Sequence, residues 1–352
     1  MKKLTFTRFT KFEEIPENLL PGVIAIRLEA DEEYQYPLEV KTSDYESQIR
    51  SLKTPLPSDI ARISLIAHIG DHVVGLGSTR LNIGEQNRKN CSVYVNVLTE
   101  ERKKGYGRSI LKEIVKEIPG EVETIFFNVF PINERFSTHI EKKYPVKLGM
   151  VTRKSASDLR KFQLDSVRSR CKELRQQASD FEFVIIRDCE FPENFDLDKY
   201  AEVLAEIWND MPREDLDFED EKITAKYFEE IREQLEIEQS HNWLIVAVHK
   251  ESGEYAGVTD IYVDFKFPDV IYQGDTGVIS RFRGNKLGLT LKYMMLEQIL
   301  SSPELSMPKY ITTHNAQSNE HMIAINNELL YEEVAMINEY EIKKLDLLNL
   351  LS

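Results

Sequence analysis

Hydrophobic and polar residues alternate along the chain in a pattern that predicts strands and helices in a fixed order. Residues 60–85 are dense in β-branched and apolar residues around Gly70-Asp71, which predicts two strands joined by a turn. Residues 91–98 and 122–130 predict two further strands. Between them, apolar residues recur at helical spacing before Pro119-Gly120 ends the pattern. These apolar positions are Ile110, Leu111, Ile114, Val115 and Ile118.

The second half of the chain repeats this order. Three strand-like stretches, a glycine-containing basic turn, a helical stretch and a further strand follow one another; they are 242–253, 255–265, 270–280, 281–288, 289–300 and 310–316. Gly105 and Lys286 hold corresponding places 181 residues apart, and the opening strands near Phe6 and Ile185 are 179 apart. Two features with nearly the same offset indicate a duplicated domain.

The repeat predicts two domains of α+β class, each a mostly antiparallel mixed sheet flanked by helices. We expect the first domain over residues 1–154 and the second over 181–352. Residues 155–180 are polar and favour helix, which predicts a connecting helix between the two.

Charge and composition exclude several classes of protein. The 352 residues carry a net charge of −15, which argues against nonspecific nucleic-acid binding. No apolar run is long enough to span a membrane, and the N-terminus lacks the apolar core of a secretory signal. Cys91, Cys171 and Cys189 are far apart and form no CxxC pair, so we expect neither a disulfide framework nor a thiolate zinc site. A cytoplasmic location fits.

Two basic turns in this acidic chain point to a compact anion. Each turn follows a strand and opens a helix, where free N–H groups and the helix dipole favour phosphate. In the first turn Gly105 and Gly107 let the backbone approach a ligand closely. The pattern is neither GxxxxGK[ST] nor a dinucleotide-binding fingerprint at the start of a βαβ unit. An ordinary turn with solvated lysines is the alternative, which the second copy makes less attractive.

The stretch VLTEERKKGYGRSIL resembles the acetyl-coenzyme-A motif of the GNAT acetyltransferase superfamily, [Q/R]-x-x-G-x-[G/A], through Arg102, Gly105 and Gly107. The second half resembles the C-terminal half of tandem GNAT proteins, the group that includes mycothiol-synthase-like enzymes. That resemblance rests on QGDTGVISRFRGNKLGLTLKYMML and ITTHNAQSNEHMIAINNELLY. Lys286 stands where the superfamily usually has the first motif glycine, and Leu330-Tyr331 stands where Gly-Phe is common.

The resemblance implies two acetyl-CoA sites. In the first half the binding residues are Val97, Leu98, Thr99, Arg102, Lys103, Lys104, Gly105, Tyr106, Gly107 and Arg108. In the second half they are Val278, Ile279, Ser280, Arg283, Gly284, Asn285, Lys286, Leu287, Gly288 and Leu289, together with Asn315 and Asn319. Capping of a helix is the alternative role for Asn319.

The resemblance also implies direct acetyl transfer to an amine, with a backbone N–H near Val278–Ser280 or Val97–Thr99 polarising the carbonyl. Many superfamily members carry a tyrosine acid seven residues after a helix-opening asparagine. Counting from Asn319 and Asn133 gives Asn326 and Ile140 instead. Asn326 is therefore a candidate for orienting a thiol or water, with a buried structural amide as the alternative.

An alkylamine with a pKa near 10.4 is almost fully protonated at pH 7, so a base assists its attack. We expect Asp275, on the central strand of the second half, to be that base. A turn-stabilising role is its alternative, and Asp260 on the preceding strand is the second candidate. The first half has no carboxylate in CSVYVNVL; it binds coenzyme A, shapes the acceptor site or works on its own.

Other polar features have simpler interpretations. Residues 210–221 hold seven carboxylates, which predicts a solvated acidic helix start or a site for a cationic amine. The histidines show no metal-ligand spacing, so no metal is predicted, and His314 and His321 are expected to pack. Trp208 and Trp243 are expected in the core.

The sequence thus predicts a cytoplasmic tandem GNAT N-acetyltransferase that uses acetyl-CoA and a small-molecule primary amine. We expect it to bind neither nucleic acid nor membrane and to be a monomer or homodimer. Protein lysines are an alternative acceptor. An inactive coenzyme-A-binding regulatory or scaffold protein is the alternative function.

Overall fold

The computed structural model describes residues 3–130, 134–216, 218–305 and 308–352, with the side chains of 134–136 excepted. The chain forms two compact units. Unit 1 comprises Met1–Thr152, Arg213–Glu219 and Ala335–Ser352, and unit 2 comprises Arg153–Pro212 and Asp220–Val334.

Unit 1 is a mixed sheet with the strand order β1-β2-β3-β4-β5-β12. Strands β4 and β5 pair in parallel, whereas the pairs β1–β2, β2–β3, β3–β4 and β5–β12 are antiparallel. The strands are β1 (Thr5–Phe9), β2 (Ile60–Ile69), β3 (His72–Asn82), β4 (Asn90–Val97), β5 (Thr124–Val129), β12 (Tyr331–Lys343) and the beginning of β6 (Lys147–Asp158). The helices are α1 (Leu20–Gln35), α2 (Tyr45–Lys53), α3 (Tyr106–Lys116), α4 (Glu134–Lys143) and α10 (Lys344–Leu351).

Both faces of the unit 1 sheet are covered because its strands alternate apolar side chains between two cores. On β2, Leu65 packs with α3 and α10, whereas the next residue, Ile66, packs with α1 and α2. Successive strand residues point to opposite faces, so a run of apolar residues serves both layers. This explains why the strands within 60–85 are dense in apolar residues, where a half-exposed strand would alternate strictly.

Unit 2 repeats the plan with the strand order β6-β11-β10-β9-β8-β7. Its own strands are β7 (Phe181–Arg187), β8 (His241–His249), β9 (Tyr255–Val263), β10 (Val270–Val278) and β11 (Tyr310–Ala316). Its helices are α5 (Leu164–Gln177), α6 (Leu197–Asn209), α7 (Ala225–Glu238), α8 (Leu287–Ser301) and α9 (Glu320–Glu328). On β8, Ile245 faces the core beneath α8, and Val246 faces the core beneath α6 and α7.

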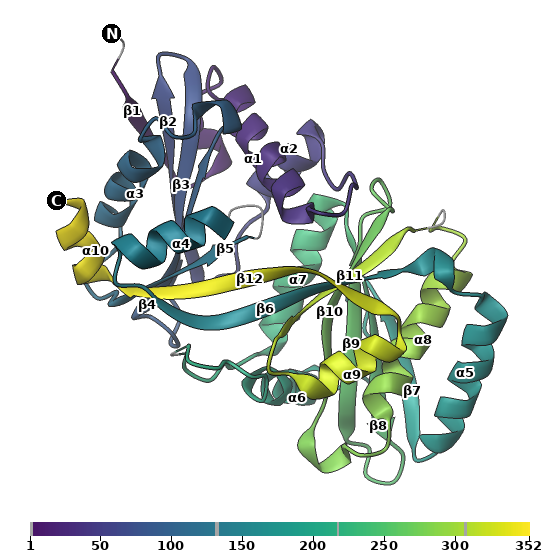
Figure 1. Ribbon diagram of the computed structural model, residues 1–352. Coiled ribbons are helices and arrows are strands. Elements are labelled where there is room, and N and C mark those ends of the chain that lie inside the picture. The colour runs from purple at the N-terminus through teal and green to yellow at the C-terminus, as the bar shows by residue number, and fades with distance from the viewer. Residues whose placement is uncertain (1–2, 131–133, 217, 306–307) are drawn as a thin grey trace. The chain divides into compact units, whose positions relative to one another are not determined.

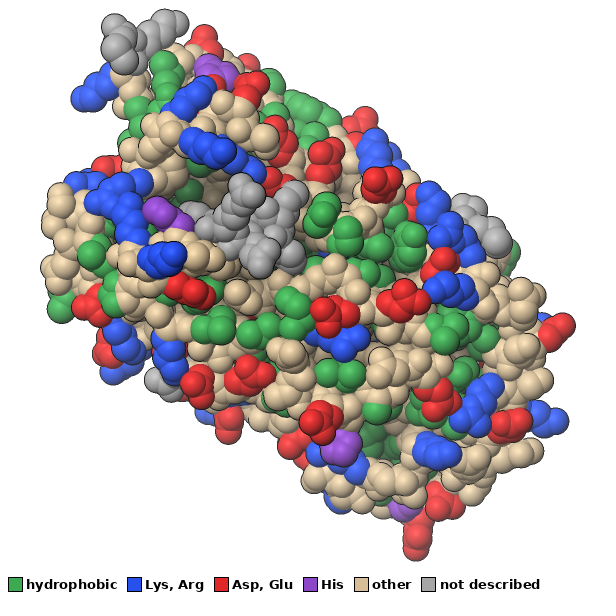
Figure 2. Space-filling model, in the orientation of Figure 1, with side chains coloured by type: hydrophobic (Ala, Val, Ile, Leu, Met, Phe, Trp, Pro, Cys, Tyr) green, Lys and Arg blue, Asp and Glu red, His purple; other side chains and the backbone are tan. Residues whose placement is uncertain are grey.

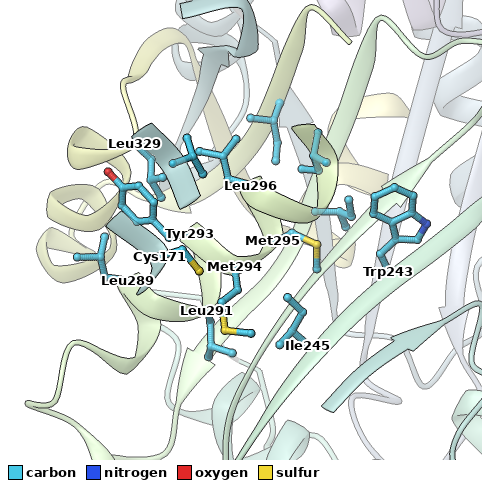
Figure 3. Close-up of a cluster of buried hydrophobic side chains, with 14 of the residues drawn as sticks. Cys171, Trp243, Ile245, Leu289, Leu291, Tyr293, Met294, Met295, Leu296 and Leu329 are labelled. Atoms are coloured by element: carbon cyan, nitrogen blue, oxygen red, sulfur yellow. The ribbon is translucent and has the colours of Figure 1, made fainter. Parts of the chain in front are cut away.

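Helix α8 is buried nearly all round, because α5 covers the side of α8 that does not face the sheet (Figures 1 and 3). The polar helix α5 carries a narrow apolar stripe that makes this contact: Val167, Cys171 and Leu174, followed by Ala178 at its C-terminal end. The structure therefore differs from the predicted connecting helix over 155–180. Residues 155–158 belong to β6, and α5 is a structural layer of unit 2.

The predicted second domain, 181–352, also differs from the structure at its end. Residues Ala335–Ser352 belong to unit 1, because Asn338–Lys343 of β12 pair antiparallel with Thr124–Val129 of β5. Strand β6 is also divided between the units. Its residues up to Thr152 belong to unit 1, and those from Arg153 belong to unit 2. Local periodicity predicts the strands, but the partner of each strand is set by distant residues.

The α+β class and the mixed, mostly antiparallel sheets are confirmed. Within the described residues, no helix has both the length and the apolar character needed to cross a membrane.

Candidate active site

In each unit two neighbouring parallel strands separate before they end. The paired register of β10 and β11 covers only Val270–Tyr272 and Tyr310–Thr312, yet β10 continues to Val278. In unit 1 the pairing of β4 with β5 covers Asn90–Ser92, and β4 continues to Val97. Beyond the paired residues, one edge of each central strand is open to an extended ligand that can hydrogen-bond with backbone.

The ladder identifies the N–H group that faces this open edge. Ile279 N donates to Ala256 O of the adjoining segment, so its neighbour Val278 directs its N–H to the other side. The same alternation holds in unit 1, where Leu98 N donates to Val74 O and Val97 points its N–H outward. Of the expected Val278–Ser280 and Val97–Thr99 donors, Val278 and Val97 therefore have the suitable direction. Ile279 and Leu98 are engaged in the sheet.

The turns that follow these strands open helices with left-handed residues. Gly105 has φ +87° before α3, and Lys286 has φ +53° before α8. Neither helix has a side-chain cap at its N-terminus, so the first N–H groups of each remain directed at the turn. The arrangement is suited to an anion.

Gly107 and Gly288 lie where the helix N-terminus meets the strand end. A Cβ on Gly107 would come within 3.7 Å of Val97 Cγ2, and one on Gly288 within 3.7 Å of Val278 Cγ2. A larger side chain at either glycine would enter the space between the open strand edge and the helix.

The motif arginines fasten the turns to the strands. Arg102 Nε donates to Val97 O at 3.0 Å, and Arg283 Nε donates to Val278 O at 2.9 Å. Arg102 also pairs with Glu33 at 2.5 Å, and Arg283 pairs with Asp210. The positive charge of each arginine is therefore partly neutralised by a carboxylate of the protein. The sequence of the basic turns does not show these ion pairs.

The remaining predicted residues of the turns differ in their partners. Lys104 pairs with Glu101, and Arg108 donates to Leu350 O. Thr99 is held through its N–H and hydroxyl by Glu29. The exposed turn residues Lys103 and Lys286 both have positive φ. The corresponding turn of unit 2 contains Ser280, Gly284 and Asn285. The first turn of α8 contains Leu287 and Leu289, which are both buried.

Asp260 and Asp275 line one pocket of unit 2, on neighbouring strands. Asp275 lies where the β9–β10 register shifts, in an irregularity between Gln273 and Thr276. Gly274 is required there, because a Cβ at this position would collide with Asp260 Oδ1. Trp208 Nε1 donates to Asp275 Oδ2 at 2.8 Å, and Asn242 Nδ2 donates to Asp260 Oδ2 at 3.1 Å.

Burial disfavours the ionised form of both carboxyl groups. Burial raises the pKa of Asp260 to about 8, with the charge of Asp275 as the second cause. Burial also raises the pKa of Asp275, and the hydrogen bond from Trp208 opposes this effect. Two interacting carboxyl groups lose their protons as a pair. At neutral pH the pair therefore retains about one proton, a state suited to accepting a second one.

The rest of this pocket is apolar and aromatic. The pocket is small, with a cavity volume of about 30 Å³, and its lining comes from α6, α7, β8, β9 and β10 and from the segment after β7. Besides the two aspartates, the lining residues are Cys189, Phe191, Tyr200, Leu204, Tyr227, Phe228, Ile231, Asn242, Leu244, Val258 and Tyr262. None of them is cationic.

Asn326 lies outside that pocket, in a buried polar chain. Its Oδ1 accepts from Lys292 Nζ at 2.7 Å, and its Nδ2 donates to Asn315 Oδ1 at 2.8 Å. Burial lowers the pKa of Lys292 to about 7. Asn319 Oδ1 accepts from Met322 N at 3.1 Å, so Asn319 caps α9, as its alternative role predicted. In unit 1, Ile140 lies in an apolar cluster, and Asn133 is outside the described residues.

Sequence reasoning missed Trp208 as a site residue and placed it in the core. It packs against that core, but its indole N–H orients Asp275. The helix start predicted within 210–221 is also wrong. Helix α7 begins at Ala225, and no described residue of 210–221 is helical. Asp210 from this segment is the partner of Arg283.

One group of possible metal ligands occurs among the described residues, at the first basic turn. Ligand atoms of His72, Glu100 and Glu101 lie within 4.8 Å of one another. The group is largely exposed, and Glu101 already pairs with Lys104 and His72. It supports no metal assignment.

Solved structures share this fold over the whole length of the chain. A tandem GNAT protein from the clavulanic acid biosynthesis pathway is 18% identical, with a TM-score of 0.73, and the match covers 97% of this chain and 99% of that one. A GCN5-related N-acetyltransferase from Sphaerobacter thermophilus is 11% identical, with a TM-score of 0.56 and 96% of both chains covered. No family model and no curated protein matches the chain. The predicted tandem GNAT fold is confirmed.

Proposed function

We propose that this protein is an acetyl-CoA-dependent N-acetyltransferase whose catalytic half is unit 2. The observation that supports this most strongly is the position of Asp275. It lies three residues before Val278 on the strand whose open edge leads to the N-terminus of α8. A proton acceptor, an outward N–H group and an anion-binding helix end thus occur on one continuous piece of chain.

Acetyl-CoA, when bound, supplies an acetyl group activated as a thioester. Val278 N–H would polarise its carbonyl, and the turn from Arg283 to Gly288 would hold its phosphates. Asp275 would take one proton from the acceptor ammonium, which frees the nitrogen lone pair for attack on the thioester carbonyl. Trp208 fixes one oxygen of Asp275 and leaves the other for that proton. Cleavage of the C–S bond would release coenzyme A as a thiolate, which would take the second proton lost by the nitrogen. Asn326 carries no titratable proton, so this proposal assigns the proton transfer to Asp275.

Unit 1 has a comparable open edge and turn but no carboxyl group on β4. This favours a different role for unit 1, in which it binds coenzyme A without catalysing transfer. If unit 2 also lacked activity, the protein would be the coenzyme-A-binding regulator or scaffold of the alternative interpretation.

Glycine variants test which unit binds acetyl-CoA. Gly288→Glu should abolish calorimetric binding in unit 2, because it places a carboxylate between the strand edge and the helix end. Gly107→Glu is the matched change in unit 1. We expect Gly288→Glu alone to remove acetyl-CoA-dependent release of thiol in the presence of amines. Full activity of Gly288→Glu would contradict the assignment to unit 2.

Acetyl-CoA binding without thiol release, over a broad set of amines, would favour the non-catalytic alternative. Release with nucleophiles other than amines would contradict the proposed reaction. The acceptor is proposed to be a small molecule rather than nucleic acid. In support, acidic and basic side chains are interspersed on the face in Figure 2, without one continuous basic field.

A further inference from the structure

We propose that the pocket of unit 2 selects an acceptor with a single ammonium group on an otherwise apolar body, and rejects diamines and amino acids. The inference rests on the proposed function and names its substrate class. It is carried by the composition of the pocket wall, which combines aromatic rings with two adjoining carboxyl groups and no basic side chain.

The carboxyl pair supplies attraction for one positive charge. Trp208 donates a hydrogen bond to Asp275, and Asn242 donates one to Asp260. Asp260 Oδ1 is buried, and no hydrogen-bond donor meets it at normal geometry. Two buried carboxyl groups this close resist carrying two negative charges together. A second ammonium group in the pocket would therefore find no second anion.

The other titratable groups that face the pair do not change this balance. Tyr200, Tyr227 and Tyr262 have pKa values raised by burial, and burial raises the pKa of Cys189 to about 12. All four are neutral at pH 7. Farther out, Asp188 is paired with His241. The charge of Arg232 tends to lower the pKa of Cys189, but Arg232 does not line the pocket.

A carboxylate on the acceptor would be equally unfavourable. It would enter a wall without a lysine, arginine or histidine, and an unpaired buried charge is costly. This separates amino acids from simple amines.

Aromatic rings form the surface that would receive the apolar body. Tyr200 stacks on Phe228 with ring centroids 4.8 Å apart, and Tyr227 meets Phe228 edge-on at 5.3 Å. Phe191 packs on the same Phe228 at 5.6 Å. Ring faces attract an ammonium group, and their area favours apolar substituents. These ring-to-ring contacts hold the aromatic side chains in fixed positions relative to one another.

A matched series of four-carbon compounds tests the proposal: n-butylamine, 1,4-diaminobutane and 4-aminobutanoate. They share the reacting amine and chain length and differ only in the group at the far end. We expect kcat/KM for acetyl-CoA-dependent thiol release to be at least ten-fold higher with n-butylamine than with either of the others. A diamine or amino acid that equals n-butylamine would overturn the inference and leave the proposed acetyl transfer intact.

A binding measurement separates the pocket from the reaction. The chain has two tryptophans, and Trp208 bonds to Asp275 while Trp243 lies in the core on the other face of the sheet. In Trp243→Phe, butyltrimethylammonium, which cannot be acetylated, should change the fluorescence of Trp208. Trp208→Phe should show no change, and neither should 1-pentanol with Trp243→Phe.

Binding of butyltrimethylammonium without thiol release from any amine would support the pocket and contradict the proposed function. The inference is overturned if that cation leaves Trp208 fluorescence unchanged, or if 1,4-diaminobutane binds as tightly. Asp275→Asn in the Trp243→Phe background should weaken binding of the cation at least ten-fold.

Discussion

At the scale of single residues, a buried neighbour changes what a side chain can do. Asp275 is an ordinary aspartate in the sequence. In the fold it shares a pocket with Asp260, accepts from Trp208 and has a raised pKa. The identity of the proposed base could be predicted from its strand, but its chemistry depends on residues 67 positions earlier and 15 positions earlier in the chain.

The raised pKa values predict the pH dependence of the reaction. A base is active when deprotonated, and burial raises the pKa of Asp275, so kcat/KM should rise with pH over a range above that in which an exposed aspartate ionises. Asp275→Asn should lower kcat about 10²-fold or more at pH 8, with acetyl-CoA affinity unchanged. Stopped assays from pH 6 to 9 measure both.

Asp260→Asn is the companion variant. It removes the neighbouring carboxyl group, so the pKa of Asp275 should fall and the rise in activity should move to lower pH. A purely structural role for Asp260 predicts lower activity with the midpoint of the profile unchanged.

At the scale of elements, the two motif turns show how a backbone conformation overrides residue preference. Lys286 adopts the left-handed conformation that Gly105 adopts in unit 1. Sequence comparison of the halves predicts the equivalence of these two positions, and the structure confirms it. The cost of a side chain at this conformation is about 1 kcal/mol.

Lys286→Gly should therefore stabilise unit 2 by about 1 kcal/mol, less the entropy that glycine gains in the unfolded chain. Lys286→Ala is the control, because it removes the charge and keeps the Cβ. Urea denaturation of both variants gives the free energy of unfolding of unit 2, and the two values are compared. Equal stabilities for Gly and Ala would show that the left-handed conformation carries no such strain.

Helix α5 illustrates what periodicity leaves undecided at this scale. Its apolar stripe was present in the sequence but narrow, and its polar residues suggested a linker. The structure shows why the stripe is there. It packs against apolar residues of α8 that face away from the sheet.

At the scale of the whole molecule, the C-terminal segment joins the unit that begins the chain. Tyr340 of β12 is fully buried in unit 1, and its hydroxyl donates to Glu141 at 2.6 Å. It stacks on Phe127 of β5 with ring centroids 5.5 Å apart. The last strand is thus part of the core of unit 1.

Tyr340→Ala should destabilise unit 1 by about 3–5 kcal/mol through the cavity that it leaves. Hydrogen exchange should lose protection in β1–β5 while β7–β10 keep theirs. Tyr310→Ala, at a partly exposed position of β11, is a control for loss of a tyrosine from unit 2. Equal loss of protection in both units after Tyr340→Ala would contradict the assignment of β12 to unit 1.

From the sequence alone we predicted the central strands of each half, the helix after each basic turn, the two turns and the duplication. These depend on local periodicity and on glycines and prolines, which act over a few residues. Tertiary structure decided which strands pair, that α5 covers α8 and that β12 completes unit 1. It also brought Trp208, Asn242, Asp260 and Asp275 to one pocket. These features depend on contacts between residues far apart in the chain, whose geometry is set only when both sheet faces are packed.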